Sequence, residues 1–86
     1  MNVDFTKAFN KQFEKLTEKR QKQAKAAIAL FLRDITSPSL RNHALKGEWL
    51  GYRSISAGGD FRLHFRMINQ DTILFVAVGT HSQLYK

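Results

Sequence analysis

The feature that most constrains the fold is a strict alternation of side chains from Phe61 to Ile68. One face of a strand would carry Phe61, Leu63, Phe65 and Met67, and the other face would carry Arg62, His64, Arg66 and Ile68. A sheet covered by helices on one side would bury the first set and leave the second set on its opposite face. The sequence therefore predicts a half-buried strand with an open basic face.

Two more strands are predicted around this one, so that the segment from Gly51 to Lys86 forms three strands joined by two turns. The turns are Ala57–Asp60 and Asn69–Thr72. In the earlier strand, Tyr52, Ser54 and Ser56 share one face, and Arg53 and Ile55 share the other. The uninterrupted apolar run from Ile73 to Val78 is typical of a central strand. We expect Gly79 to end this strand, so that the tail from His81 to Tyr85 can reach the face of Arg62.

The first half of the chain predicts a short strand followed by a helical hairpin. Met1 to Phe5 suits a strand, and Asp4 or Thr6 can cap the following helix. Helical spacing aligns Phe5, Phe9, Phe13 and Leu16, a stripe that we interpret as core. A second helix, predicted over Lys19–Ile35, would bury Ala24, Ala27, Ile28, Phe31, Leu32 and Ile35. Thr36-Ser37-Pro38 would stop it.

Length and composition limit the class of protein. The 86 residues, 43% of them hydrophobic, suit a single domain over 1–86 with one core. The absence of cysteine excludes disulfides and thiolate metal sites and fits a reducing cytoplasm. No apolar run is long enough to span a bilayer, so we expect a cytoplasmic protein without a membrane partner.

Charge predicts the kind of partner. Fourteen Lys and Arg against seven Asp and Glu give a net charge of +7, which favours a polyanion or an acidic protein. The positive charge is densest at Lys15, Lys19, Arg20, Lys22 and Lys25. This cluster suits either a solvated outer face or contacts with RNA phosphates.

The residue types permit one kind of chemistry better than others. The motifs of esterases, Walker-type nucleotidases and zinc metalloproteases are absent from the sequence. Histidines, arginines, a tyrosine and an acid on one basic face can instead cleave RNA without a metal or other cofactor. The segment Ser39–Leu50 lacks periodicity, would lie over a sheet edge, and carries His43, Lys46 and Trp49. We interpret Trp49 as a packing anchor rather than a base-stacking platform.

Two stretches carry a resemblance to a known family. HALKGEWLGYRSISAGGDFRLHF and VAVGTHSQLY resemble the RelE/ParE superfamily of bacterial toxins, most closely its YafQ type. The resemblance implies an α+β fold in which an N-terminal helical hairpin packs on a small, twisted, mainly antiparallel β-sheet. It also implies a toxin of a type II toxin-antitoxin system that cleaves mRNA on the ribosome. Its partners would be a cognate antitoxin, the ribosome and mRNA.

The resemblance also implies roles for individual residues. The matching catalytic positions are His43, Asp60, Arg62, His81 and Tyr85. His81 and Asp60 would transfer protons, Arg62 would hold the phosphate, His43 would position the substrate or share the base role, and Tyr85 would orient a nucleotide. Further RNA contacts are expected from Lys46, Arg53 and Arg66.

Three positions depart from the YafQ pattern. Ala44 replaces a proline, and Ser54 and Ser56 stand where an acid and a second histidine are expected. We therefore treat Ser56 and His64 as auxiliary candidates, with His64 able to compensate for the missing histidine. The departures leave two alternatives open: a ParE-like gyrase inhibitor without nuclease activity, or a degraded toxin that survives as an antitoxin-binding module.

Overall fold

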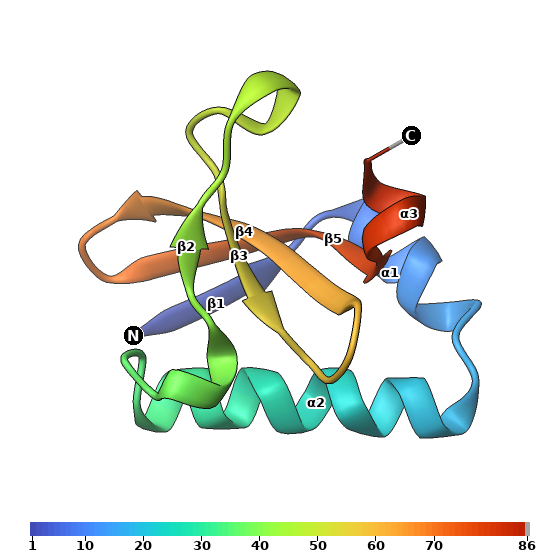
Figure 1. Ribbon diagram of the computed structural model, residues 1–86. Helices are drawn as coiled ribbons and strands as arrows, with labels where there is room; N and C mark the ends of the chain where they lie inside the picture. The colour runs from blue at the N-terminus through green and yellow to red at the C-terminus, as the bar shows by residue number, and fades with distance from the viewer. Residues whose placement is uncertain (86) are drawn as a thin grey trace.

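The computed structural model describes residues 1–85, which form a mixed sheet with two helices on one of its faces (Figure 1). The elements in chain order are β1 (Asn2–Phe5), α1 (Lys7–Glu14), α2 (Glu18–Arg33), the 3₁₀ turn η1 (Pro38–Leu40), β2 (His43–Ala44), the 3₁₀ turn η2 (Gly47–Trp49), β3 (Arg53–Ser56), β4 (Phe61–Asn69), β5 (Thr72–Thr80) and α3 (His81–Leu84). The strand order is β1-β5-β4-β3-β2. Strand β1 runs parallel to β5, and the other pairs are antiparallel. The predicted α+β class is confirmed.

The register of β2, β3 and β4 determines which side chains share the open face. Ser54 pairs with His43 on one side and with His64 on the other. Paired residues in neighbouring strands project from the same face, so these three side chains form a row across three strands. Ser56 pairs with Arg62, which places the arginine next to this row.

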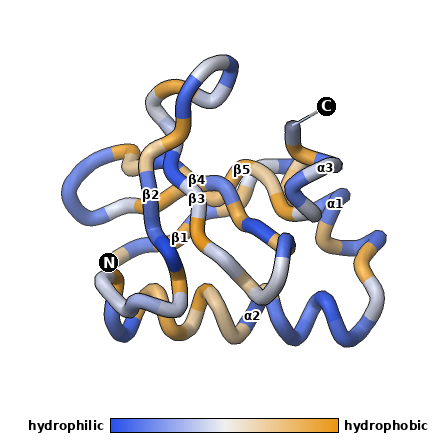
Figure 2. Tube along the Cα trace, viewed as in Figure 1, coloured by the Kyte–Doolittle hydropathy of each residue, from blue (hydrophilic) through white to orange (hydrophobic). Residues whose placement is uncertain are grey.

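The core lies on the opposite face, between the sheet and helices α1 and α2. Its aromatic centre is Phe75, whose ring is 5.6 Å from that of Phe65, 6.0 Å from Phe31 and 6.1 Å from Phe9. The other buried apolar side chains of this cluster are Ala24, Ala27, Leu40, Ile55, Phe61, Leu63, Ile73 and Val78. The predicted core role of the aromatic stripe holds for Phe9, and Phe13 packs against the cluster. Along α2 itself, Figure 2 shows hydrophobic residues in the C-terminal half and hydrophilic residues in the N-terminal half.

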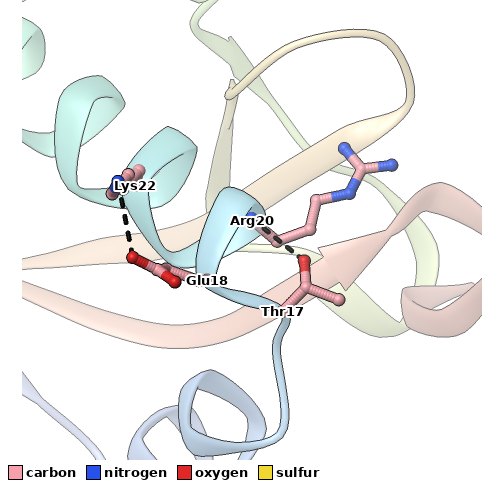
Figure 3. Close-up of polar contacts among 4 residues, drawn as sticks. All are labelled: Thr17, Glu18, Arg20 and Lys22. Atoms are coloured by element: carbon pink, nitrogen blue, oxygen red, sulfur yellow. Dashed lines mark hydrogen bonds and ion pairs between the residues drawn. The ribbon is translucent and has the colours of Figure 1, made fainter.

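The basic N-terminal half of α2 is stabilised by local interactions (Figure 3). The Thr17 hydroxyl accepts a hydrogen bond from the Arg20 backbone N–H at 3.2 Å, a typical N-cap. Glu18 and Lys22 form an exposed ion pair at 3.5 Å. Arg20 also lies over the Phe61 ring, 4.8 Å from its centroid. Because α2 covers the core face, the basic residues that it carries lie on the opposite side of the sheet from His43 and His64. These residues are Lys19, Arg20, Lys22 and Lys25.

Several predicted boundaries were wrong at element ends. Helix α2 ends at Arg33 rather than Ile35, because the Asp34 backbone is extended. Ile35 therefore lies beyond the helix and is 39% exposed instead of buried. Leu32 is 46% exposed because it lies one residue round the helix from the buried Phe31. Met67 is 41% exposed, because β4 extends past the helices into the β4–β5 hairpin.

The two ends of the chain differ from the prediction as well. The first strand is confirmed, and Thr6 rather than Asp4 caps α1 by accepting from Phe9 N–H at 3.1 Å. Phe5 therefore belongs to β1 and is 41% exposed rather than core, although its ring lies 5.0 Å from the Phe9 ring in a tilted arrangement. At the other end, β5 continues through Gly79 to Thr80, and the expected tail is the helix α3.

None of the helices in residues 1–85 has the length and apolarity needed to cross a bilayer.

Candidate active site

His64 lies at the centre of the open face and is fully buried, which corrects the expectation that it is exposed there. Its ring lies 4.4 Å from Trp49 and 5.4 Å from Tyr85, both in edge-to-face orientation. These rings come from the loop after β2 and from the end of α3. Strand alternation could not predict this burial, because it does not show which later segments fold over a face.

The charges around His64 show which groups gather at the site. The pKa of His64 is lowered from 6.5 to about 4, first because burial disfavours the imidazolium, and then because His43, His81 and Arg62 repel its charge. His64 is therefore neutral near pH 7. His43, Arg62 and His81 come from three different elements and lie close enough to act on one ring.

His43 is oriented by the backbone that precedes it. Its Nδ1 lies 2.7 Å from the Arg41 carbonyl oxygen. A carbonyl can only accept, so this contact assigns the proton of a neutral imidazole to Nδ1 and leaves Nε2 as a free acceptor. Arg41 ends η1 in the left-handed conformation, with φ 49°, and this turn carries its carbonyl to His43. The sequence contained no signal for the role of Arg41.

Arg62 is held against the turn between β3 and β4. Its Nη1 donates to the Gly59 carbonyl at 2.5 Å, the Phe61 carbonyl at 3.2 Å and the Ser56 hydroxyl at 3.3 Å. A guanidinium has five N–H donors, so its other N–H groups can serve an anion. Ser56 thus positions the arginine, a role that a histidine in its place would not reproduce with the same short side chain.

Helix α3 is fixed at both ends. A capping box closes its start, in which the Thr80 hydroxyl accepts from Gln83 N–H and Gln83 Oε1 accepts from Thr80 N–H. The His81 N–H donates to the Asp60 carbonyl at 2.8 Å. At the other end, Trp49 Nε1 donates to the Leu84 carbonyl at 3.2 Å. In the free protein Trp49 therefore is a packing anchor, and it joins the loop after β2 to α3.

Tyr85 completes the group of side chains brought in by α3. Its ring lies 4.4 Å from the His81 ring. Burial raises the pKa of the Tyr85 phenol, and the charge of Arg62 opposes this. The phenol therefore stays protonated near pH 7 and can donate a hydrogen bond.

The structure brings most of the predicted site residues together, but not all. His43, Arg62, His64, His81 and Tyr85 share one face, with Asp60 exposed at its rim and the exposed Lys46 in the loop above it. Arg53 instead pairs with Phe65 on the helix-covered face and donates to Asn42 at 2.9 Å. Arg66 is exposed farther along β4, opposite Leu74. Arg53 therefore lies off the face that carries His43 and His64, whereas an RNA contact by Arg66 stays a prediction.

Ser54 and Arg41 are the members that sequence reasoning did not assign. Ser54 is buried between His43 and His64, and its signals were the alternation that placed it on the Tyr52 face and its position where the YafQ pattern has an acid. Among residues 1–85, no three His, Asp or Glu side chains are placed to share a metal ion.

Solved structures with the same fold are bacterial toxins. YafQ from E. coli strain BL21(DE3) superimposes with a TM-score of 0.80 at 22% identity, covering 99% of this chain and 98% of that chain. The E. coli DinJ-YafQ toxin-antitoxin complex gives 0.78 at 23% identity, covering 99% and 97%. The YoeB/ParE toxin from Agrobacterium tumefaciens gives 0.75 at 19% identity, covering 94% and 99%. These likenesses establish the fold.

Sequence comparison identifies the family. No curated protein matches this chain. The family model described as "Bacterial toxin of type II toxin-antitoxin system, YafQ" matches residues 1–86, which is the whole chain. The resemblance carried by the segments from His43 and Val76 is thereby confirmed. This chain belongs to the YafQ family of type II toxin-antitoxin toxins.

Proposed function

We propose that this toxin is an endoribonuclease that cleaves mRNA on the ribosome by metal-free acid-base catalysis. The observation that carries the proposal is the convergence of His43, Arg62, His81 and Tyr85 on one face of the sheet. Two histidines able to transfer protons flank an anchored arginine. This set supplies a base, an acid and a phosphate-binding group.

The chemistry follows from the orientation of each side chain. His43 Nε2 accepts the proton of a ribose 2′-hydroxyl, whose oxygen then bonds to the adjacent phosphorus. Arg62 N–H groups bind the phosphate oxygens and stabilise the added charge. The bond from phosphorus to the 5′-oxygen breaks, and His81 donates a proton to that oxygen. The products are a 2′,3′-cyclic phosphate and a 5′-hydroxyl.

Asp60 and Tyr85 support this reaction in different ways. The backbone of Asp60 fixes the start of α3 through His81 N–H, and its exposed carboxylate is an alternative proton acceptor to His43. Tyr85 offers an aromatic face to a nucleotide next to the scissile bond. Lys46, in the loop above the site, adds a phosphate contact.

The ribosome would supply the substrate geometry. The candidate groups lie at an open face with His43, Asp60 and His81 exposed, so the site by itself holds a flexible RNA weakly. In-line attack needs the 2′-oxygen, phosphorus and leaving oxygen in one line, and a ribosome-bound message can be held that way. We therefore expect free RNA to be a poor substrate.

An antitoxin would block the same face. The structure of a YafQ relative contains DinJ, its antitoxin. For this chain, the net charge of +7 favours an acidic antitoxin segment that covers Arg62 and the neighbouring histidines.

Primer extension on a reporter mRNA after induction of the toxin tests the proposal. We expect discrete cuts at positions in frame with the codons. Intact message together with damaged chromosomes would instead support the gyrase-inhibiting alternative, and intact message with intact chromosomes would support the degraded toxin.

A further inference from the structure

Ser54 and His64 form a buried polar pair that the proposed reaction leaves unused. They are 1% and 0% exposed and face each other across β3 and β4. Ser54 Oγ and both ring nitrogens of His64 have no hydrogen-bond partner within residues 1–85. The large majority of buried side-chain polar atoms in folded proteins are hydrogen-bonded, so three unpartnered atoms at one place mark a position where a polar partner can bind.

The cover over this pair consists of two aromatic side chains. Trp49 approaches the His64 ring at 82° and Tyr85 at 63°. Neither ring belongs to a strand, and the two segments that carry them are joined by the hydrogen bond from Trp49 Nε1 to the Leu84 carbonyl. Moving these two segments apart to uncover the pair therefore requires this bond to break.

The chemistry of the pair and its cover fits a nucleobase. A neutral imidazole presents one donor and one acceptor, and a hydroxyl presents both, which matches the alternating donors and acceptors on the edge of a base. Trp and Tyr rings are the side chains on which unstacked bases stack. Arg62, which is proposed to bind the phosphate, is two residues from His64 on the same face of β4.

We propose that the Ser54–His64 pair is a hydrogen-bonding seat for one nucleobase of the RNA substrate, covered in the free protein by Trp49 and Tyr85. When the rings part, the base edge bonds to the pair and its faces lie against the aromatic rings. This inference rests on the proposed function, because it takes RNA as the ligand. It adds base selection at a defined pair of side chains.

Binding of a short, uncleavable RNA tests the seat apart from catalysis. The probe is a set of trinucleotides with 2′-deoxyribose at the scissile position, differing in the adjacent base. Trp49 is the only tryptophan in the chain, so its fluorescence reports events next to His64. We expect a saturable change in the wild type, with different affinities for different bases.

Four variants separate hydrogen bonding from shape. His64→Phe keeps an aromatic ring and removes both nitrogens, and Ser54→Ala removes only the hydroxyl. Each should weaken binding of the preferred trinucleotide roughly tenfold and reduce the difference between bases. His64→Gln, which restores a polar side chain, should recover part of that loss. Tyr52→Phe removes a hydroxyl from a ring 5.4 Å from Trp49 and is the matched control, with unchanged base preference expected.

The outcomes distinguish the seat from the nuclease. Weaker, less selective binding by folded His64→Phe and Ser54→Ala supports the seat, even if the wild type cuts no message and the nuclease proposal fails. Wild-type base preference in both variants overturns the seat, even if the wild type cuts message on the ribosome. Absence of any fluorescence change in the wild type overturns it also. Should His64→Phe fail to fold, the Ser54→Ala result decides.

Discussion

At the scale of single residues, the site is determined by backbone and side-chain contacts that assign each group one state. The Arg41 carbonyl selects the tautomer of His43, and three acceptors fix one nitrogen of Arg62. Burial keeps His64 neutral and keeps the Tyr85 phenol protonated. The role proposed for each of these residues therefore depends on its neighbours. The residue type alone does not reveal that role.

The buried His64 should make the stability of the fold depend on pH. Its pKa is about 4 in the folded protein and near 6.5 when unfolded, so the unfolded chain binds more protons between these values. The contribution of His64 to the free energy of unfolding should fall by roughly 3 kcal/mol as pH drops from 6.5 to 4. Above pH 6.5 this contribution should stay constant. Urea unfolding at several pH values measures the slope.

His64→Phe is the control for this prediction. It removes the titrating group, so the contribution between pH 4 and 6.5 should disappear. An unchanged slope in the variant would mean that other groups carry the pH dependence and that His64 titrates normally.

At the scale of elements, α3 carries half of the proposed chemistry and depends on Gly79. A Cβ added at Gly79 would lie 2.8 Å from Gln83 Oε1, the atom that accepts from Thr80 N–H in the capping box. The glycine thus lets α3 pack directly on β5, with His81 and Tyr85 over the site. The sequence suggested that Gly79 ends a strand, whereas its structural role is to permit this close approach.

Gly79→Ala should therefore disturb α3 more than the sheet. The displaced Gln83 would weaken the capping box, at a cost of about 0.5–2 kcal/mol in unfolding free energy. Ribosome-dependent cleavage should fall further than stability, because His81 and Tyr85 move with the helix. Thermal unfolding and a cleavage assay on the same preparation compare the two effects.

Thr80→Ser is the matched control, since it keeps the capping hydroxyl and should retain both stability and cleavage. Wild-type activity in Gly79→Ala would show that the position of α3 does not matter for the reaction.

Much of the fold could be predicted because its elements depend on local patterns. The alternation in β4, the apolar run of β5 and the helical spacing of Phe9 and Phe31 each reflect burial on one face. Part of the candidate site could be proposed because His43, Arg62 and His81 lie in stretches that resemble the YafQ type.

The remainder depended on packing between distant segments. Trp49 and Leu84 are 35 residues apart in sequence, and their contact determines whether His64 is open or covered. The exposure of Ile35 depended on the end of α2, where the Asp34 backbone becomes extended. Neither is visible in residue order, because both result from competition between tertiary contacts.

At the scale of the whole molecule, positive charge is distributed over both sides of the sheet. One basic surface contains Arg62 and Lys46 at the site, and the other contains Lys19, Lys22 and Lys25 on α2. The two surfaces can serve different partners. Under the proposed function, the site surface would contact the substrate and the antitoxin, and the α2 surface would be free to approach ribosomal RNA.

Charge reversal should separate these surfaces. Arg62→Glu should weaken binding of an acidic antitoxin segment at least tenfold and make the remaining affinity less sensitive to salt, because a site charge has been inverted. Lys19→Glu, on the far side, should change antitoxin binding little. Titration calorimetry at two salt concentrations measures both. Equal affinities for the two variants would show that the antitoxin does not cover the site.

The most direct test of the nuclease proposal is the cleavage of ribosome-bound mRNA by wild type and His81→Ala. A general acid contributes typically ~10²–10⁴-fold, whereas an exposed surface histidine contributes to stability within roughly 0.5 kcal/mol. We predict a rate loss of that size with nearly unchanged thermal unfolding and antitoxin binding. Ser82→Ala, an exposed neighbour in α3, should cut at the wild-type rate. Full cleavage by His81→Ala at matched concentration would contradict the proposed acid-base site.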